Sequence, residues 1–295
     1  MAGSQNNVEI VSGLGSLRQR YDALLCDIWG VVHNGQTPFR EAITALQTWR
    51  ASGGLVVLIT NAPRPSKLLL PQFDEIGVPL DIYDHMASSG DVTRVALERF
   101  RGRSVFHLGP ERDQSLLDGM GLKKTSLEDA EFILCSGLFD DETETPDDYE
   151  NLLAQALERQ LEMICANPDI VVQRGDRLIY CGGALAEAYE KKGGKATYAG
   201  KPHAPIYDHC LDLIAGMSGD GSGHIKRERI LVVGDGPKTD IKGAMDQGFD
   251  SLFIGGGIHS QDCFNPDGGL DQSGMGEVFG SEGSWPTYAM PWLVG

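Results

Sequence analysis

Residues 23–32, ALLCDIWGVV, and residues 229–240, RILVVGDGPKTD, decide the fold. Each begins with a short apolar run of the length of a buried strand, and each breaks into a loop at an aspartate, Asp27 in the first and Asp235 in the second. In the second stretch Asp240 follows five residues later, at the start of a predicted helix. The pattern predicts two buried strands that end in polar loops.

Other apolar runs repeat this pattern along the chain. Residues 54–65, GLVVLITNAPRP, predict another buried strand, which closes with Thr60 and Asn61. Residues 40–53 have apolar positions at helical spacing and stop at a glycine, which predicts a helix. Further strands are expected at SVFHLG, EFILCSG, LEMICANPD and SLFIGGG. Strands that alternate with helices in this way predict an α/β protein with parallel sheets covered by helices on both faces.

The size and charge of the chain narrow the classes of protein and partner. Its 295 residues exceed the usual size of one domain, about 100–200 residues, so two domains are expected. The formal net charge is −17, and such a field repels DNA, RNA and anionic lipid, which need clustered lysines and arginines. Nucleic acid and membranes are therefore not expected as partners. A small phosphorylated molecule can bind only where a cation and a few lysines neutralise it.

The cysteines and the N-terminus favour a reduced, cytoplasmic protein. The six cysteines are dispersed, without a CxxC pair, and most lie in apolar runs, where a cysteine behaves as a small buried hydrophobe. The N-terminal stretch MAGSQNNVEI lacks the basic region and apolar run of a signal peptide. The longest apolar runs also fall short of the roughly 18–20 residues of a membrane span.

Polar residues close three of the predicted strands. In an open α/β sheet, ligands bind at the carboxyl ends of the strands, beside the point where the strand order reverses. Asp27, the pair Thr60-Asn61 and Asp235 all occupy such ends. Each alone has an ordinary explanation, because aspartate commonly caps a helix and Thr-Asn commonly starts a turn. Their joint occurrence favours one ligand site.

These strand-end residues resemble the motifs of the haloacid dehalogenase-like (HAD) superfamily, and specifically of its class IIA branch, which carries a large α/β cap inserted mid-chain. The motifs that carry the resemblance are Asp27-Ile28-Trp29-Gly30-Val31, Thr60-Asn61, Gly200-Lys201-Pro202 and Gly234-Asp235-Gly236-Pro237-Lys238-Thr239-Asp240. Two further matches, SSGDVTRVAL at 88–97 and Asn167-Pro168-Asp169, belong to the cap. The four ordered motifs together are specific, whereas any one alone is weak.

The resemblance implies an organisation of the chain. It implies a Rossmann-like, doubly wound parallel-sheet core formed by residues 1–87 and 195–295, with an inserted α/β cap domain at 88–194. Many more residues separate Thr60-Asn61 from Lys201 than one crossover needs, which fits this insertion. The glycine-rich stretch 267–284 is expected to be a loop of the core. Cap surfaces often pair in relatives, so a homodimer is a candidate oligomer.

The resemblance also implies roles for the motif residues in a phosphatase or phosphotransfer hydrolase that acts on a small phosphorylated metabolite. Asp27 would attack phosphorus and form an aspartyl-phosphate. Mg²⁺ would be held by the carboxylates of Asp27 and Asp235 and the backbone carbonyl of Trp29, with Asp240 nearby directly or through water.

Two further motifs would bind the phosphoryl group. The Thr60 hydroxyl and the Asn61 backbone N–H would hold phosphoryl oxygens, and the ammonium of Lys201 would supply a counter-charge.

Position 29 departs from the family's pattern. The family's phosphatases carry a second aspartate there, which protonates the leaving group and later activates water. The indole of Trp29 has one N–H donor and no group that titrates near neutral pH, so it cannot do this work. General acid–base assistance is worth roughly 10²–10⁴ in rate. His33 is a candidate substitute proton donor, and the alternative is an ordinary loop histidine.

Three hypotheses about function follow from Trp29. The chain is a weakened phosphatase, a phosphatase restricted to good leaving groups such as aryl or acyl phosphates, or a phosphate- and metal-binding or regulatory protein that has lost turnover. A nucleotide-dependent dehydrogenase is disfavoured, because no GxGxxG follows the first strand.

Overall fold

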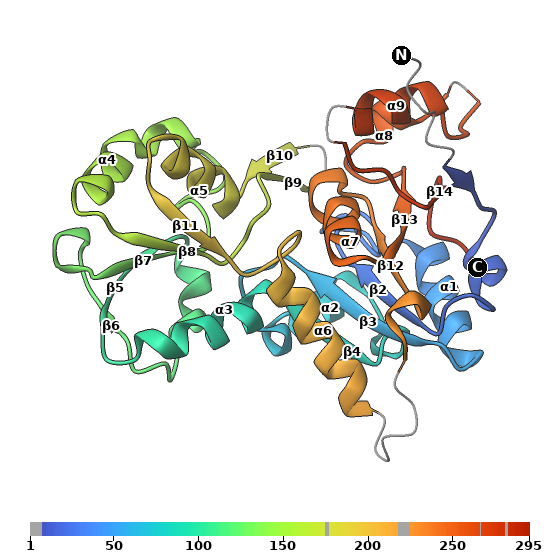
Figure 1. Ribbon diagram of the computed structural model, residues 1–295, viewed down its shortest axis with the longest axis horizontal. Helices are drawn as coiled ribbons and strands as arrows, with labels where there is room; N and C mark the ends of the chain where they lie inside the picture. Colours follow the sequence, from blue (N-terminus) through green and yellow to red (C-terminus); the bar gives the residue numbers. More distant parts are fainter. Residues whose placement is uncertain (1–7, 175–176, 218–224, 266, 281–282) are drawn as a thin grey trace. The chain divides into compact units, whose positions relative to one another are not determined.

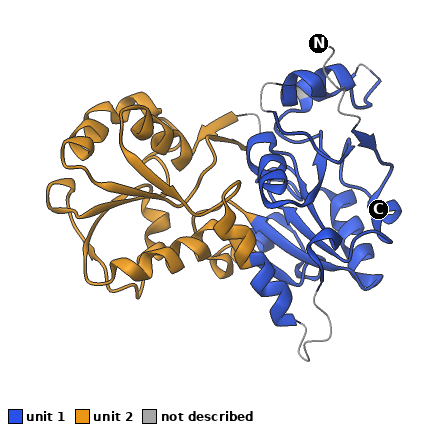
Figure 2. Ribbon diagram, in the orientation of Figure 1, with its two compact units in different colours: residues 1–59, 72–86, 210–295 blue, residues 60–71, 87–209 orange. Residues whose placement is uncertain are grey.

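The computed structural model describes residues 8–295 apart from 175–176, 218–224, 266 and 281–282. The chain divides into two compact units (Figure 2). Unit 1 comprises residues 1–59, 72–86 and 210–295, and unit 2 comprises residues 60–71 and 87–209. The interval 88–194, expected as the cap, lies wholly within unit 2.

A seven-stranded sheet forms the framework of unit 1 (Figure 1). Its strands in spatial order are β1 (Glu9–Ile10), β14 (Tyr288–Met290), β13 (Asp250–Ile254), β12 (Ile230–Gly234), β2 (Ala23–Asp27), β3 (Leu55–Thr60) and β4 (His85–Ser88). The pairings from β1 through to β3 are parallel. Strands β3 and β4 follow β2 on one side of the sheet, and β13 and β14 follow β12 on the other side. The strand order therefore reverses between β2 and β12. Because parallel crossovers are right-handed, their connections cover opposite faces of the sheet. The predicted doubly wound α/β core is confirmed.

Helices accompany this sheet along the chain. They are α1 (Arg40–Ala51), α2 (Leu70–Ile76), α6 (Ala204–Met217), α7 (Lys242–Gln247), α8 (Ser260–Cys263) and α9 (Gln272–Gly280), of which α2 and α6 cross the boundary between the units. The predicted helix at 40–53 is confirmed as α1. Its buried side chains Ala42, Ala45, Leu46 and Trp49 recur at helical spacing. Thus one face of α1 belongs to the core.

The glycine-rich stretch 267–284 is not the single loop that the sequence predicts. Within it α9 forms over Gln272–Gly280, while residues 281–282 lie outside the described part of the chain. Met275 and Phe279, four positions apart, are buried in a cluster with Phe253. A glycine in a helix costs about 1 kcal/mol relative to alanine. In α9 the burial of these two side chains outweighs that cost.

Unit 2 contains a sheet of its own. Its strands in spatial order are β11 (Lys195–Tyr198), β8 (Glu162–Cys165), β7 (Phe132–Cys135), β5 (Ser104–Leu108) and β6 (Lys123–Lys124), all paired in parallel. The predicted strands at SVFHLG, EFILCSG and LEMICANPD are confirmed as β5, β7 and β8. A separate antiparallel pair joins β9 (Val171–Arg174) to β10 (Arg177–Tyr180). Among the described residues of this unit, three helices lie wholly within it, namely α3 (Ser89–Leu97), α4 (Glu150–Glu158) and α5 (Gly182–Lys191).

The sheet of unit 2 is covered on both faces. Along β7 the side chains alternate between two clusters of buried apolar residues, with Phe132 and Leu134 in one and Ile133 and Cys135 in the other. Unit 2 therefore has its own hydrophobic core.

The cysteines are buried, as their apolar surroundings predict. All six are reduced, outside any disulfide bond. None of the helices in the described part of the chain combines the length and apolar character that a membrane span needs.

Candidate functional site

Three aspartates of unit 1 converge where the strand order reverses. Asp27 ends β2, Asp235 follows β12, and Asp240 lies in the short π-helical turn Pro237–Ile241. One carboxylate oxygen from each lies within 4.8 Å of the others. The side chains are buried, with exposures of 6%, 6% and 1%. The structure thus brings together three of the four predicted metal ligands in a single cluster, and Trp29 lies two residues beyond Asp27 in the chain.

The charge of this cluster calls for a cation. Two carboxylates within 4.8 Å of each other repel by about 3 kcal/mol or more at an effective dielectric constant near 20. Burial reduces the screening by water. A donor set that consists only of carboxylate oxygens fits a hard divalent cation such as Mg²⁺.

Two glycines give the Asp235 carboxylate its space. A Cβ atom on Gly30 would lie 2.1 Å from Asp235 Oδ2, and one on Gly257 would lie 1.9 Å from the same oxygen. Gly30 also adopts a φ of +83°, which disfavours any other residue. The backbone N–H of Ile258 donates to Asp235 Oδ2 at 2.9 Å. Backbone on two sides therefore fixes where this carboxylate lies.

The Gly234–Asp240 segment shapes the position of the third carboxylate. The backbone N–H of Gly236 donates to Asp240 Oδ2 at 3.1 Å, and the Thr239 hydroxyl donates to the same oxygen at 3.4 Å. A Cβ on Gly234 would lie 2.1 Å from Asp240 Cγ. The glycines of GDGPKTD thus allow Asp240 to fold back over the end of β12.

The loop after Asp27 is closed by Trp29 and His33. The Trp29 indole packs against Gly35, where a Cβ would lie 2.3 Å from the ring, and the Trp29 and His33 rings meet edge to face at 5.3 Å. His33 Nδ1 accepts the Gly35 N–H at 2.9 Å, and its ring also meets Phe73 edge to face at 6.0 Å. The half-buried indole therefore packs against two other residues of this loop.

His33 does not fit the role of substitute acid. It is 2% exposed, and burial lowers the pKa of its imidazole to about 4. The ring is neutral near pH 7, with Nδ1 occupied as an acceptor. The structure favours the alternative, a histidine that holds the loop together.

The remaining predicted residues lie in unit 2. Thr60, Asn61 and Lys201 are buried. The Thr60 hydroxyl accepts the Ala62 N–H at 3.2 Å. The side-chain amide of Asn61 pairs with the backbone of Lys201: Oδ1 accepts the Lys201 N–H at 2.7 Å, and Nδ2 donates to the Lys201 carbonyl at 3.1 Å. In the ladder between β2 and β3, Asp27 lies opposite Ile59, the residue before Thr60.

Two family models match the segments of the chain that contain these residues. A family model described as haloacid dehalogenase-like hydrolase matches residues 24–123, and a second model, described as HAD-hydrolase-like, matches residues 198–268. The solved structure of a haloacid dehalogenase-like hydrolase from Brucella suis 1330 is 44% identical, with a TM-score of 0.86, and covers 97% of this chain and 100% of that chain. This chain belongs to the haloacid dehalogenase-like hydrolase family.

Two curated proteins are similar at lower identity. The 5′-nucleotidase YutF of Bacillus subtilis (strain 168) is 22% identical over 84% of this chain and 92% of its own length. The ribonucleotide monophosphatase NagD of Escherichia coli (strain K12) is 26% identical over 81% of this chain and 89% of its own length.

Gly257 and Ile258 are missing from the sequence prediction of this HAD site, and so is the contact of Asp169, although the quoted cap motif includes that residue. Gly257 and Ile258 hold Asp235, and Asp169 accepts a hydrogen bond from Asn61 Nδ2 at 2.8 Å. The glycine run after SLFI could have indicated Gly257 and Ile258, because it follows a predicted strand. Nothing in the sequence paired Asp169 with Asn61.

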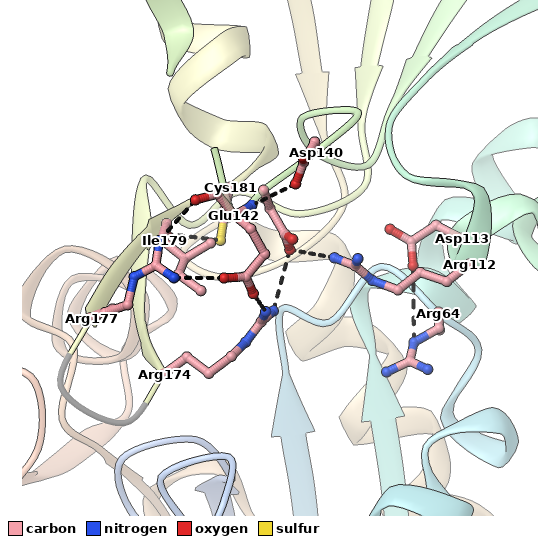
Figure 3. A network of polar contacts seen from close by, with 10 residues as sticks. Arg64, Arg112, Asp113, Asp140, Glu142, Arg174, Arg177, Ile179 and Cys181 are labelled. Carbon is pink, nitrogen blue, oxygen red and sulfur yellow. Dashed lines mark hydrogen bonds and ion pairs between the residues drawn. The ribbon is translucent and has the colours of Figure 1, made fainter. Parts of the chain in front are cut away.

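Unit 2 of this HAD protein also holds a network of charged side chains from the loop after β7, the β9–β10 pair and the segment after β5 (Figure 3). Asp141 accepts from both Arg112 and Arg174, with an Arg174–Asp141 distance of 3.2 Å. Glu142 pairs with Arg174 at 2.6 Å and with Arg177 at 2.8 Å. Because these arginines come from different segments, the network ties the β9–β10 pair to the loop after β7.

A chain of hydrogen bonds lies beside this network. Asp113 is 3% exposed, and burial raises the pKa of its carboxyl, against the effects of Arg112, Arg64 and the Ser136 hydroxyl. His107 Nε2 lies 2.9 Å from Ser136 Oγ, and burial lowers the His107 pKa to about 4. The Ser136 hydroxyl also hydrogen-bonds the Asp113 carboxyl, so the chain runs from His107 through Ser136 to Asp113.

The glycine at 257 predicts a specific loss. Gly257→Ala should displace the Asp235 carboxylate, because the new Cβ would lie 1.9 Å from Oδ2. Divalent-cation affinity, measured by titration calorimetry with Mg²⁺, should fall at least about tenfold, with catalysis falling in parallel. Gly276→Ala in α9, where a Cβ meets open space, is the matched control. Equal Mg²⁺ affinity in the two variants would show that Gly257 does not shape the site.

The pKa of His33 predicts a pH dependence of stability. Its folded value of about 4 lies below the ordinary 6.5, so between these pH values the unfolded chain binds more protons. The free energy of unfolding should therefore fall as pH drops from 6.5 to 4. The variant His33→Asn keeps an acceptor for the Gly35 N–H. Over this pH range its free energy of unfolding, measured by urea titration, should fall by roughly 3 kcal/mol less than that of wild type.

The same variant separates the two roles of His33. If His33 only closes the loop, His33→Asn keeps the shape of the wild-type pH–rate profile. An inflection of the wild-type profile that disappears in His33→Asn would instead make His33 the acid.

Proposed function

We propose that this chain is a Mg²⁺-dependent phosphatase that hydrolyses small phosphate monoesters through an aspartyl-phosphate on Asp27. The observation that carries the proposal is the convergence of three buried carboxylates within 4.8 Å at the switch point of a doubly wound sheet. The similarity to a 5′-nucleotidase and a ribonucleotide monophosphatase supports it. A formal charge of −17 is consistent with a small substrate rather than a nucleic acid.

The metal would bind among the strand-end oxygens. Asp27, Asp235 and the backbone carbonyl of Trp29 would hold Mg²⁺, with Asp240 directly or through water. When bound, the cation cancels the repulsion between the Asp27 carboxylate and the phosphate dianion.

The chain's own residues would carry two displacement steps. In the first, an Asp27 oxygen forms a bond to phosphorus while the bond from phosphorus to the leaving-group oxygen breaks. In the second, water attacks phosphorus, releases inorganic phosphate and restores the carboxylate. Thr60 Oγ1 and the Asn61 backbone N–H would bind phosphoryl oxygens throughout, and the Lys201 ammonium would stabilise their charge. Residues 88–194 would serve as the cap that excludes water.

Proton transfer is the step for which the site is poorly equipped. Trp29 replaces the usual acid, and its indole packs against Gly35 and His33. His33 is neutral near pH 7, because burial lowers its pKa to about 4. We therefore propose that the enzyme favours aryl and acyl phosphates, whose leaving groups depart without protonation. Trp29 is also the observation that supports the second candidate, a phosphate-binding protein without turnover.

The nucleophile predicts the first activity test. Asp27→Asn should lower the hydrolysis of 4-nitrophenyl phosphate on the order of 10³-fold or more, and chelation of Mg²⁺ by EDTA should do the same to wild type. The melting temperature should hold or rise, because one of three repelling carboxylates is removed. Asp246→Asn, an exposed aspartate of unit 1, is the control. Near-normal turnover by Asp27→Asn would contradict the nucleophile assignment.

The residue at position 29 predicts substrate preference. Wild type should hydrolyse 4-nitrophenyl phosphate much faster than glycerol phosphate, since alkoxides leave poorly without a proton. Trp29→Asp should raise the alkyl rate up to about 10²-fold over Trp29→Asn, which creates the same cavity without an acid. Steady-state rates on both esters measure this.

Two outcomes would overturn the leaving-group argument. A wild type already fast on glycerol phosphate would show that another group donates the proton. If wild type and a folded Trp29→Asp are both inert on every ester while Mg²⁺ binds, the binding-protein hypothesis holds instead.

A further inference from the structure

A buried hydrogen-bonded cluster in unit 2 fixes the backbone at Lys201. We call Asn61, Asp169, Gly200 and Lys201 the Asn61 cluster. The Asn61 amide uses both of its ends: Oδ1 accepts the Lys201 N–H at 2.7 Å, and Nδ2 donates to the Lys201 carbonyl at 3.1 Å and to Asp169 Oδ1 at 2.8 Å. Asn61 and Lys201 are each 2% exposed. One side chain thus joins two segments that are 140 residues apart.

Asp169 determines which way the Asn61 amide points. A carboxylate only accepts hydrogen bonds, so Asp169 selects the Nδ2 end of the amide and leaves Oδ1 for the Lys201 N–H. The bond to an ionised group is also stronger than a neutral one, about 1.5–3 kcal/mol against about 1. Without Asp169, the same amide could turn over and present a donor to the Lys201 N–H, which would break the pairing.

The backbone around Asp169 is itself held in place. Its N–H donates to Asn167 Oδ1 at 3.2 Å, and its carbonyl accepts the Gly183 N–H at 3.1 Å. A Cβ on Gly183 would lie 2.1 Å from the Pro168 carbonyl oxygen, so glycine at the start of α5 permits this close approach. The Asn-Pro-Asp loop after β8 is therefore a rigid support for the Asn61 amide.

Gly200 completes the Asn61 cluster by leaving room for it. A Cβ at position 200 would lie 2.3 Å from Asn61 Oδ1 and 2.9 Å from Ser89 Oγ. Asn61 is buried and both ends of its amide are hydrogen-bonded, so even a methyl group on Gly200 would displace the amide.

We propose that Asp169 is a positioning residue for phosphate binding, which acts through the Asn61 side chain to hold Lys201. The inference rests on the proposed function, in which the Asn61 N–H and the Lys201 ammonium bind the phosphoryl group. The Lys201 ammonium lies at the end of a flexible four-carbon stem. Because the Lys201 backbone is fixed, its ammonium can reach a smaller range of positions. The same Asn61 side chain also anchors the loop that carries the Asn61 backbone N–H, which would bind a phosphoryl oxygen.

Three variants test the inference, with 4-nitrophenyl phosphate as substrate and inorganic phosphate as competing product. Asp169→Ala should lower kcat/KM by about 10- to 100-fold and raise the inhibition constant of phosphate by a similar factor. Asp169→Asn should stay within about threefold of wild type, because its amide oxygen still accepts from Asn61 Nδ2. Gly200→Ala should resemble Asp169→Ala.

The phosphate inhibition constant separates positioning from general stability. If Asp169 only supports the fold, Asp169→Ala lowers the melting temperature but leaves that constant unchanged, and the inference is wrong. Mg²⁺ affinity should stay at its wild-type value in all three variants, since the three metal-binding aspartates belong to unit 1. Asp129→Ala, at an exposed site of unit 2, and Gly216→Ala, at an open site of α6, are the matched controls.

Failure of the inference and failure of the proposed function give different results. If wild type hydrolyses the ester and Asp169→Ala matches it, only the inference is overturned. If wild type is inert, calorimetry with inorganic phosphate decides: weaker binding by Asp169→Ala supports the inference, and equal binding, or none by wild type, overturns it.

Discussion

The mutual repulsion of Asp27, Asp235 and Asp240 is the constraint around which unit 1 is arranged. Three buried carboxylates within 4.8 Å oppose folding unless a cation or a tight backbone frame compensates. The structure supplies the frame through the amides of Ile258 and Gly236 and through the glycines that let backbone approach the carboxylates. The strand order brings the carboxylates together, because β2 and β12 are neighbours at the point where the order reverses. There the ends of the two strands lie side by side, and their connections leave to opposite faces of the sheet.

The Asn61 cluster in unit 2 is held together by interactions of a different kind. There the strong contacts are hydrogen bonds between neutral amides and backbone, with one carboxylate that fixes their direction. The acidic cluster is fixed by close approach of the backbone and by two backbone N–H donors, whereas the Asn61 cluster is fixed by the matching of side-chain donors and acceptors. The strand β3 carries the chain from one to the other, since Ile59 belongs to unit 1 and Thr60 to unit 2.

The sequence predicted those parts of the fold and site that depend on local pattern. Asp27 and Asp235 follow uninterrupted apolar runs, so their placement at strand ends could be read directly. Gly257 could not be predicted as a partner of Asp235, because that contact depends on β13 lying beside β12. The orientation of the Asn61 side chain could not be predicted either, because its hydrogen-bond partners, Asp169 and Lys201, come from distant segments of the chain. In α9, the glycine content concealed the buried pair Met275 and Phe279.

The burial of all six cysteines has a practical consequence for solution studies. Only thiolates are nucleophilic, and burial raises the pKa of Cys135 to about 12 and that of Cys263 to about 11. The native thiols should therefore react slowly with maleimide reagents while the protein is folded. One new cysteine on an exposed position of each unit could carry a fluorophore or a spin label without removal of the natural ones. Distances between the labels would then measure whether the separation of the two units changes when Mg²⁺ or a phosphate ester is added.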